Sequence, residues 1–200
     1  MLRASNFGFS DKLLMFTVKQ HHFHPDNWYG SVELSLDGET MMNAAEKVLD
    51  RNTLKEKVDS VRKAEKRVVF ANGCFDLIHI GHIHLLQQAR EQGDCLVVAV
   101  NSDSSVRQIK EPGRPVIPEG QRAEVVAALD CVDWVTIFAE PDPLVLIRLL
   151  KPDVLVKGTD WSEEEIVGAP DVREAGGQVL RIQLEPGIST SALIKRIRSR

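Results

Sequence analysis

Two histidines, His79 and His82, flank a glycine in the stretch NGCFDLIHIGH, which begins at Asn72. They stand three residues apart, so that on a helix both imidazoles lie on one face. Imidazole N–H groups donate hydrogen bonds to phosphate oxygens, and Gly81 between them lets a bulky anion approach the backbone at the first turn. Such donors count most in a transition state, where charge develops on the oxygens. The spacing therefore predicts a site for a reacting phosphate group.

The elements that must position this pair alternate between strands and helices from Val68 onward. Short β-branched runs such as VVFANG, CLVVAVNSD and DVLVKG are separated by helical patterns such as HIHLLQQAREQG. Continuous apolar strands joined by amphipathic helices indicate a parallel sheet covered on both faces, with ligands at the carboxyl ends of the strands. The histidine pair follows such a strand. The expected fold class is α/β, with a Rossmann-like doubly wound parallel sheet.

Composition restricts the partners of such a site. A formal net charge of −4 and a pI near 5.9 argue against a general binder of nucleic acid or membranes, so positive charge at an anion site must be local. Cys74, Cys95 and Cys131 each lie in or beside an apolar stretch and are expected to be buried thiols rather than disulfides or metal ligands. Without a leader pattern or a membrane-length apolar run, we expect a cytoplasmic protein.

The beginning of the chain differs from the rest. Residues 1–42 mix aromatic, glycine and polar residues without a sustained period, and are expected to form an N-terminal appendage ahead of one α/β domain over residues 43–200. That domain should open with a helix over Leu49–Arg67, with Asn52 or Thr53 as its N-cap.

The appendage contains an HHxH cluster formed by His21, His22 and His24. Three close histidines without an evident fourth ligand are interpreted as adventitious rather than as a metal site. A second hypothesis concerns translation, because the glycine and glutamate codons just before Met41 and Met42 suit a ribosome-binding sequence. The intact mass of the natively expressed protein tests whether the chain begins at Met1.

The stretch NGCFDLIHIGH resembles the signature of the HxGH nucleotidyltransferase superfamily, in its cytidylyltransferase-like branch. The later segments AVNSDSSVRQIKEPGRPVIPEGQRAEVVAALDCVDWV, PDVLVKGTDW and EPGISTSALIKRI follow in that family's order and spacing. The resemblance covers about Leu49 to Ile197 and is closest to adenylyltransferases acting on D-glycero-β-D-manno-heptose 1-phosphate. It implies a nucleotidyltransferase-type fold and direct in-line attack of the sugar phosphate on the α-phosphorus of ATP, with release of pyrophosphate and no covalent intermediate.

The resemblance also implies roles for individual residues. His79 and His82 stabilise the transferred α-phosphate, and Lys110 reaches the triphosphate. The nucleotide-binding residues implied are Cys74, Phe75, Asp76, Gly81, Arg114, Arg122, Lys157, Gly158, Asp160, Ser189 and Thr190.

Several of these residues have a purely structural alternative. Arg114 and Arg122 could instead bridge or cap helices, and Ser189 with the following threonine could simply cap the last helix. Cys74 is interpreted as a small residue lining the first turn rather than as a nucleophile. His84 lies outside the motif and is interpreted as an ordinary histidine on a helix surface.

The implied partners are ATP and a sugar 1-phosphate, with a homodimer expected from the family. ATP chemistry implies Mg²⁺ held mainly by phosphate oxygens and water, without a protein metal cage. Intact His79, His82 and Lys110 argue against a non-catalytic nucleotide-binding regulator, which stays an alternative. A class I aminoacyl-tRNA synthetase is excluded because the chain lacks a KMSKS-like segment and an anticodon-binding domain.

Three departures from the heptose group keep a second enzyme class open. The segments GISTS and GTDW resemble cytidylyltransferases for glycerol 3-phosphate, and Ile117 replaces an asparagine common in the heptose group. Leu184, in contrast, stands where those cytidylyltransferases carry an arginine. CTP-dependent transfer to glycerol 3-phosphate or a related alcohol phosphate is therefore the main alternative.

Overall fold

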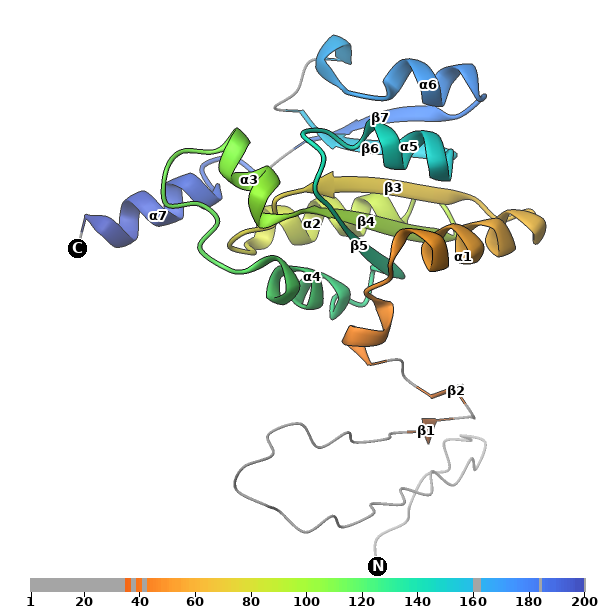
Figure 1. The fold of residues 1–200 in the computed structure, drawn as a ribbon, viewed down its shortest axis with the longest axis horizontal. Coiled ribbons are helices and arrows are strands. Elements are labelled where there is room, and N and C mark those ends of the chain that lie inside the picture. The colour runs from red at the N-terminus through yellow and green to blue at the C-terminus, as the bar shows by residue number, and fades with distance from the viewer. Residues whose placement is uncertain (1–34, 37–38, 41–42, 160–162, 184, 200) are drawn as a thin grey trace, which may run out of the picture. The chain divides into compact units, whose positions relative to one another are not determined.

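The computed structural model of the chain describes residues 35–36, 39–40, 43–159, 163–183 and 185–199 (Figure 1). The chain divides into two compact units, Met1–Met41 and Met42–Arg200. In the first unit the described residues are β1 (Ser35–Leu36) and β2 (Glu39–Thr40), which pair antiparallel. The cluster of His21, His22 and His24 lies outside the described residues, as do Asp160 and Leu184.

The second unit is built on a five-stranded parallel sheet in the order β5-β4-β3-β6-β7. Its strands are β3 (Val68–Gly73), β4 (Cys95–Asn101), β5 (Trp134–Phe138), β6 (Val154–Gly158) and β7 (Gln178–Ile182). The chain runs outward from β3 through β4 to β5, and then returns to the other side of β3 with β6. The strand order therefore reverses beside β3, where open α/β sheets bind their ligands. The predicted doubly wound α/β fold is confirmed.

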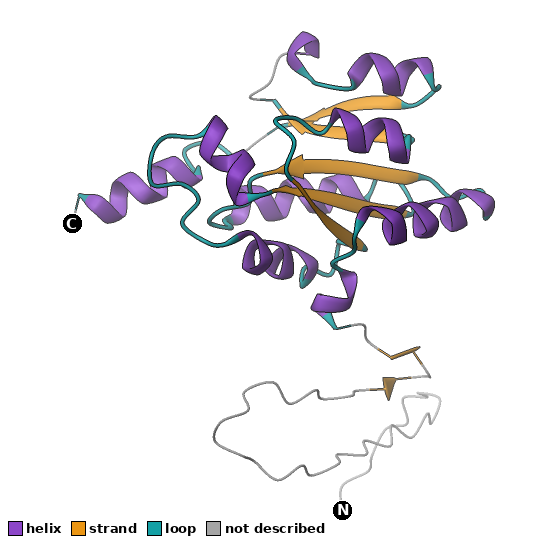
Figure 2. Cartoon of the chain, in the orientation of Figure 1, coloured by secondary structure: helices purple, strands orange, loops and turns teal. Residues whose placement is uncertain are grey.

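Helices lie against both faces of this sheet (Figure 2). The helices of this unit are α1 (Arg51–Lys63), α2 (Ile80–Arg90), α3 (Asp103–Ile109), α4 (Glu119–Ala127), α5 (Leu144–Leu150), α6 (Ala169–Glu174) and α7 (Thr190–Arg198), with 3₁₀ turns at Ala44–Lys47 and Glu163–Glu165. Of these, α7 extends away from the sheet (Figure 2). Among the described residues, no helix is both long and apolar enough to cross a membrane.

The core consists of two apolar clusters, one on each face of the sheet. Because successive side chains of a strand point to opposite faces, β3 contributes Val69 and Ala71 to one cluster and Val68 and Phe70 to the other. The first cluster is closed by α2 and α4, and the second by α1, α5 and α6. Burial on both faces explains why the central strands are apolar without alternation.

The first helix of the domain begins earlier than the capping pattern predicted. Its N-cap is Asp50, whose carboxylate accepts the backbone N–H groups of Asn52 and Thr53 at 2.8 and 3.1 Å. The prediction of Asn52 or Thr53 as N-cap was wrong, because the aspartate two residues earlier satisfies the same unpaired donors from an extended conformation. The helix also ends at Lys63 rather than at Arg67.

The three cysteines are free thiols, and the prediction that they are buried holds for Cys95 alone. Cys95 is buried within β4, while Cys74 and Cys131 are half-buried. Burial, with a smaller contribution from the negative charge of Asp133, raises the pKa of Cys95 to about 12. These thiols are therefore protonated at neutral pH and behave as small apolar side chains.

Candidate active site

The predicted histidine pair occupies the first turn of α2, directly beyond the carboxyl end of β3. His79 is the N-cap, in an extended conformation, and His82 is the third residue of the helix. Their rings stack with centroids 3.8 Å apart and an interplanar angle of 29°. The backbone N–H of His79 donates to Nδ1 of His82 at 3.4 Å. The pair is thus one fixed unit rather than two independent side chains.

Both imidazoles are neutral at physiological pH. Burial lowers the pKa of His79, and burial together with the neighbouring His79 lowers the pKa of His82 to about 4. Because Nδ1 of His82 accepts a backbone hydrogen bond, the single proton of the neutral ring resides on Nε2. Nδ1 of His79 is buried and has no hydrogen-bond partner among the described residues. His82 therefore offers a neutral Nε2–H donor at the start of α2.

This lowered pKa predicts a loss of stability in mild acid. The pKa of His82 falls from an ordinary 6.5 to about 4 on folding, so the unfolded chain takes up the proton first as the pH drops. The free energy of unfolding loses nothing from this group well above pH 6.5, and the loss grows as the pH falls toward the folded-state pKa of about 4. At pH 5 the loss amounts to about 2 kcal/mol. Urea unfolding at pH 7.5 and at pH 5 should show a smaller loss in His82→Gln than in the wild type. Equal losses would contradict the prediction.

Gly81 provides space for the first histidine. A Cβ atom added to Gly81 would lie 3.1 Å from Nδ1 and 3.2 Å from Cε1 of His79, and 3.6 Å from Cγ2 of Ile188. The sequence predicted that this glycine admits a phosphate to the backbone, and that role stays a prediction. The contact that the structure reveals is with the imidazole itself, so Gly81 also sets where His79 lies.

Gly81→Ala is expected to lower turnover about 10-fold to 100-fold, because the added methyl group displaces His79 from the position in which it is predicted to contact the reacting phosphate. The helix should lose no stability, since alanine is favoured over glycine by about 1 kcal/mol in helices. Turnover and melting temperature are compared with Gly120→Ala in α4, where an added Cβ meets nothing within 4 Å. Equal turnover in the two variants would contradict the prediction.

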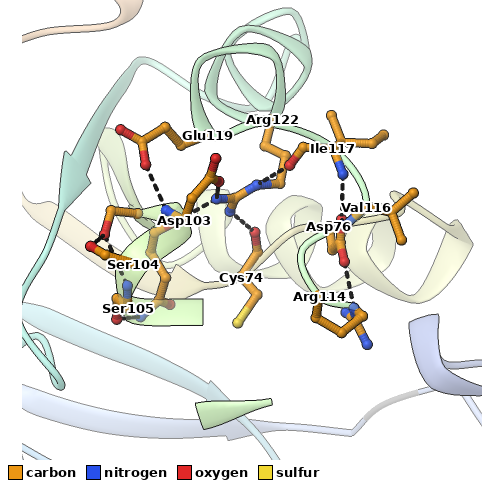
Figure 3. Close-up of polar contacts among 12 residues, drawn as sticks. Cys74, Asp76, Asp103, Ser104, Ser105, Arg114, Val116, Ile117, Glu119 and Arg122 are labelled. Atoms are coloured by element: carbon orange, nitrogen blue, oxygen red, sulfur yellow. Dashed lines mark hydrogen bonds and ion pairs between the residues drawn. The ribbon is translucent and has the colours of Figure 1, made fainter. Parts of the chain in front are cut away.

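The segment between β3 and α2 is tied to a later loop through Asp76 (Figure 3). Oδ2 of Asp76 accepts from Nε of Arg114 at 2.5 Å, and Oδ1 accepts the backbone N–H groups of Val116 and Ile117 at 2.8 and 3.0 Å. Both side chains of this ion pair are buried. Burial opposes ionisation of Asp76, but the hydrogen bonds from Ile117, Arg114 and Val116 outweigh it and hold its pKa below the usual value. Asp76 is thus a charged anchor for this loop.

A second buried arginine, Arg122 of α4, joins the carboxyl ends of two strands (Figure 3). Its guanidinium donates to the carbonyl oxygens of Cys74, Asn101 and Ile117 and, at 2.8 Å, to Oδ1 of Asp103. Arg114 and Arg122 thus both bridge segments of the protein, which is the structural alternative to nucleotide binding that the sequence left open. Direct nucleotide contacts by Arg114 and Arg122 stay predictions.

Cys74 lies within reach of the positive charges of Lys110, Arg122 and Arg114. Burial raises the pKa of its thiol, and the charges of Lys110, Arg122 and Arg114 counter that only in part. A protonated thiol is a poor nucleophile. The surroundings of Cys74 therefore favour the lining role predicted for it over covalent catalysis.

Lys110 is the C-cap of α3, and its side chain is exposed. It lines a surface cavity of about 470 Å³ together with Arg107, Glu111 and Arg114. Within the described ranges its ammonium forms neither a hydrogen bond nor an ion pair, yet its charge acts on the thiol of Cys74. Lys110 is therefore an available cation within electrostatic reach of the start of α2.

The beginning of α7 lies beside the same segment. Ser189 is its N-cap, and the hydroxyl of Ser189 accepts the backbone N–H of Ala192 at 3.1 Å. Oγ1 of Thr190 donates to the carbonyl oxygen of Leu77 at 3.3 Å. Both hydroxyls thus have structural partners close to the histidine pair, and phosphate binding by either stays a prediction.

The remaining predicted residues are more widely placed. Lys157 and Gly158 end β6, the neighbour of β3 on the side where the strand order reverses, while Asp160 lies outside the described residues. His84 is a helix-surface histidine, as expected: its Nδ1 contacts Oε1 of Glu185 at 2.5 Å, and the two side chains are 41% and 43% exposed.

Sequence reasoning missed some polar groups at this edge. Oδ1 of Asn72, the first residue of the stretch NGCFDLIHIGH, is buried without a hydrogen-bond partner among the described residues. The sequence could have indicated this residue, because an asparagine ends the otherwise apolar run VVFAN. The backbone donors of Val116 and Ile117 carried no such signal, because side-chain identity says nothing about an amide.

A neutral histidine pair that begins a helix at the edge of a doubly wound parallel sheet is the arrangement expected of a nucleotidyltransferase-type enzyme. The sequence profile described as "Cytidylyltransferase-like" matches residues 70–196. The chain therefore belongs to the cytidylyltransferase-like family.

Curated relatives share this part of the chain. It is 48% identical over 154 residues to "Bifunctional protein HldE" of Syntrophotalea carbinolica, a match that covers 77% of this chain and 31% of the relative. It is 53% identical over 134 residues to the protein of the same name from Citrifermentans bemidjiense, covering 67% and 28%. The chain thus spans about a third of the length of these relatives.

Two solved structures are also similar. A lipopolysaccharide core biosynthesis protein from Thermoplasma volcanium is 30% identical with a TM-score of 0.51, and the match covers 60% of this chain and 97% of that one. Pantoate-beta-alanine ligase from Francisella tularensis is 16% identical with a TM-score of 0.51, covering 74% and 72%. The second likeness concerns the fold alone.

Proposed function

We propose that the chain transfers an adenylyl group from ATP to D-glycero-β-D-manno-heptose 1-phosphate, giving ADP-heptose and pyrophosphate. The observation that carries this proposal is a neutral, fixed histidine pair at the start of α2 in a chain 44–53% identical to HldE proteins. Similarity to a lipopolysaccharide core biosynthesis protein supports a role in surface-glycan assembly. Because ATP is the proposed donor, we expect the protein to act in the cytoplasm.

In the proposed reaction an oxygen of the sugar phosphate attacks the α-phosphorus of ATP. A phosphate monoester is already anionic at neutral pH, so no general base is required. A bond forms between that oxygen and the α-phosphorus, while the bond from the α-phosphorus to the bridging oxygen breaks and pyrophosphate leaves. Nε2–H of His82 donates to the α-phosphate oxygens as they gain charge, aided by the unpaired N–H groups at the start of α2. Such preorganised donors supply about 3–4 kcal/mol each.

Mg²⁺ enters this proposal as part of the ATP substrate. Among the described residues, no three His, Cys, Asp or Glu side chains gather in a way that would hold a metal ion. Carboxylates near the site already accept from protein donors, as Asp76 does from Arg114 and Glu111 does from Ser191. Such a donor set suits an ion held by phosphate oxygens and water, which would neutralise charge on the leaving pyrophosphate.

Lys110→Ala is expected to lower turnover about 100-fold, because the triphosphate loses a positive charge that aligns and neutralises it. Stability should change by less than about 0.5 kcal/mol, since the side chain is exposed. Lys57→Ala, an equal loss of charge at an exposed position of α1, is the control and should leave turnover unchanged. Wild-type turnover in Lys110→Ala would contradict its role.

Pyrophosphate release tests the proposal when ATP and CTP are crossed with β-heptose 1-phosphate and glycerol 3-phosphate in the presence of Mg²⁺. Turnover with ATP and heptose phosphate alone supports it. Turnover with CTP and glycerol 3-phosphate supports the cytidylyltransferase alternative, which the segment GISTS favours. Nucleotide binding by calorimetry without any turnover supports the non-catalytic regulator. Light scattering on the same sample tests the proposed homodimer.

A further inference from the structure

Phe75 lies in the centre of the NGCFD segment with an unusual backbone. Its φ is +47°, and of the three non-glycine residues with positive φ in the described ranges it alone is buried, at 4% exposure. Left-handed backbone costs a bulky L-residue about 1–2 kcal/mol. Such strain persists only where the surroundings impose it, and it concentrates at functional sites.

The two chain neighbours of Phe75 are what impose this conformation. The carbonyl oxygen of Cys74 accepts from the guanidinium of Arg122, and the carboxylate of Asp76 accepts from Nε of Arg114 at 2.5 Å. Both arginines are buried, at 1% and 5% exposure. Because the residues on either side are each held by a buried guanidinium, the backbone between them has little freedom to relax.

The ring of Phe75 contacts the second histidine of the motif. Its centroid lies 5.3 Å from that of His82, with the rings tilted by 54°, a favourable arrangement for aromatic pairs. Gly73 leaves room for the ring, since a Cβ there would lie 3.2 Å from Cε2 of Phe75. His82 also stacks on His79, with ring centroids 3.8 Å apart. The His82 ring thus has two aromatic neighbours: Phe75, from the segment before α2, and His79, the N-cap of α2.

We infer that Phe75 is a positioning residue, whose clamped ring holds the His82 imidazole in the orientation that donates to the reacting phosphate. The inference rests on the proposed role of His82 in nucleotidyl transfer. Phe75 also helps to exclude water from His82, and burial is the larger cause of the lowered pKa of this histidine. Within the part of the chain that the structure describes, His79 is the one titratable group whose charge acts on His82, so loss of the phenyl ring changes the burial and leaves these charges as they are.

Phe75→Leu is the direct test, since it keeps an apolar side chain and removes the ring. We expect kcat to fall about 10-fold to 100-fold with KM for ATP within about threefold, because a misplaced donor affects the transition state more than binding. In an NMR titration without substrate, the His82 ring should begin to protonate between pH 7 and pH 5, where the wild-type ring stays neutral. Phe138→Leu, at a buried position of β5, is the matched control and should change neither kcat nor the titration.

A folded Phe75→Leu protein with wild-type kcat, or with an unchanged His82 titration, would overturn the inference. If that variant does not fold, Gly73→Ala replaces it, because the added methyl group presses on the Phe75 ring at 3.2 Å without removing it. A fall in kcat of about threefold to tenfold with an upward shift of the His82 titration is then expected, and no change in either would overturn the inference. The titration needs no substrate, so it distinguishes a failure of positioning from a failure of the proposed reaction.

Discussion

Replacing His82 with alanine is expected to reduce turnover about 1,000-fold while the protein stays folded. Removal of a single preorganised donor to a developing oxyanion costs about 100-fold to 1,000-fold in other enzymes. The upper end applies here because the change also removes the stacking partner of His79, whose ring lies 3.8 Å away. The fold should survive, since His82 is half-buried and lies outside both apolar clusters.

Steady-state pyrophosphate release with purified protein measures this effect. His84→Ala is the control, because His84 lies on the same helix and, among the described residues, its side chain has one polar contact, with the half-exposed Glu185. His82→Gln should recover about tenfold over alanine, since its side-chain amide places an N–H donor near the position of Nε2. More than a tenth of wild-type turnover in a folded His82→Ala protein would contradict the assigned role.

Arg122→Leu is expected to destabilise the protein by about 3–5 kcal/mol, because a buried guanidinium that serves four acceptors is lost. The change strands three carbonyl oxygens and the carboxylate of Asp103, which now accept from one buried guanidinium. Buried acceptors without donors keep their full desolvation cost. Thermal unfolding should shift down by about 10 °C or more for a domain of this size.

Arg148→Leu provides the matched comparison for this loss. Arg148 also pairs with an aspartate, Asp171, at 2.5 Å, but its side chain is 62% exposed. An exposed pair of this kind contributes less than about 1 kcal/mol. Arg122→Lys should recover only part of the loss, because one ammonium cannot reach four acceptors in a fixed fork. Equal destabilisation by the two leucine variants would show that burial and acceptor number do not set the cost.

The features that sequence reasoning predicted are those set by local pattern. Uninterrupted apolar runs such as CLVVAVN separated by helical periods predicted a parallel sheet, and residues 95–101 form a fully buried strand of one. The spacing of His79 and His82 predicted two rings on one helix face, and they are stacked. Each inference needed only the geometry of a strand or of one helical turn.

What sequence reasoning left open depends on contacts between distant segments. Arg122 meets the carbonyl of Cys74 across 48 residues, and Arg114 meets Asp76 across 38. Nothing near either arginine in the chain distinguishes a phosphate ligand from a structural bridge, because topology brings the acceptors together. The same holds for Phe75, which has a positive φ and whose two chain neighbours are both bonded to distant arginines.

The stereochemical course of transfer tests the central claim most directly, namely that a neutral histidine pair supports one in-line displacement at the α-phosphorus. The substrate is ATP with a sulfur of defined configuration on that phosphorus, and the configuration of the nucleotide sugar is read by phosphorus NMR. A single displacement predicts inversion. Retention would mean two displacements and a covalent nucleotidyl-enzyme, which would contradict direct transfer and make the Cys74 thiol the first candidate nucleophile despite its raised pKa.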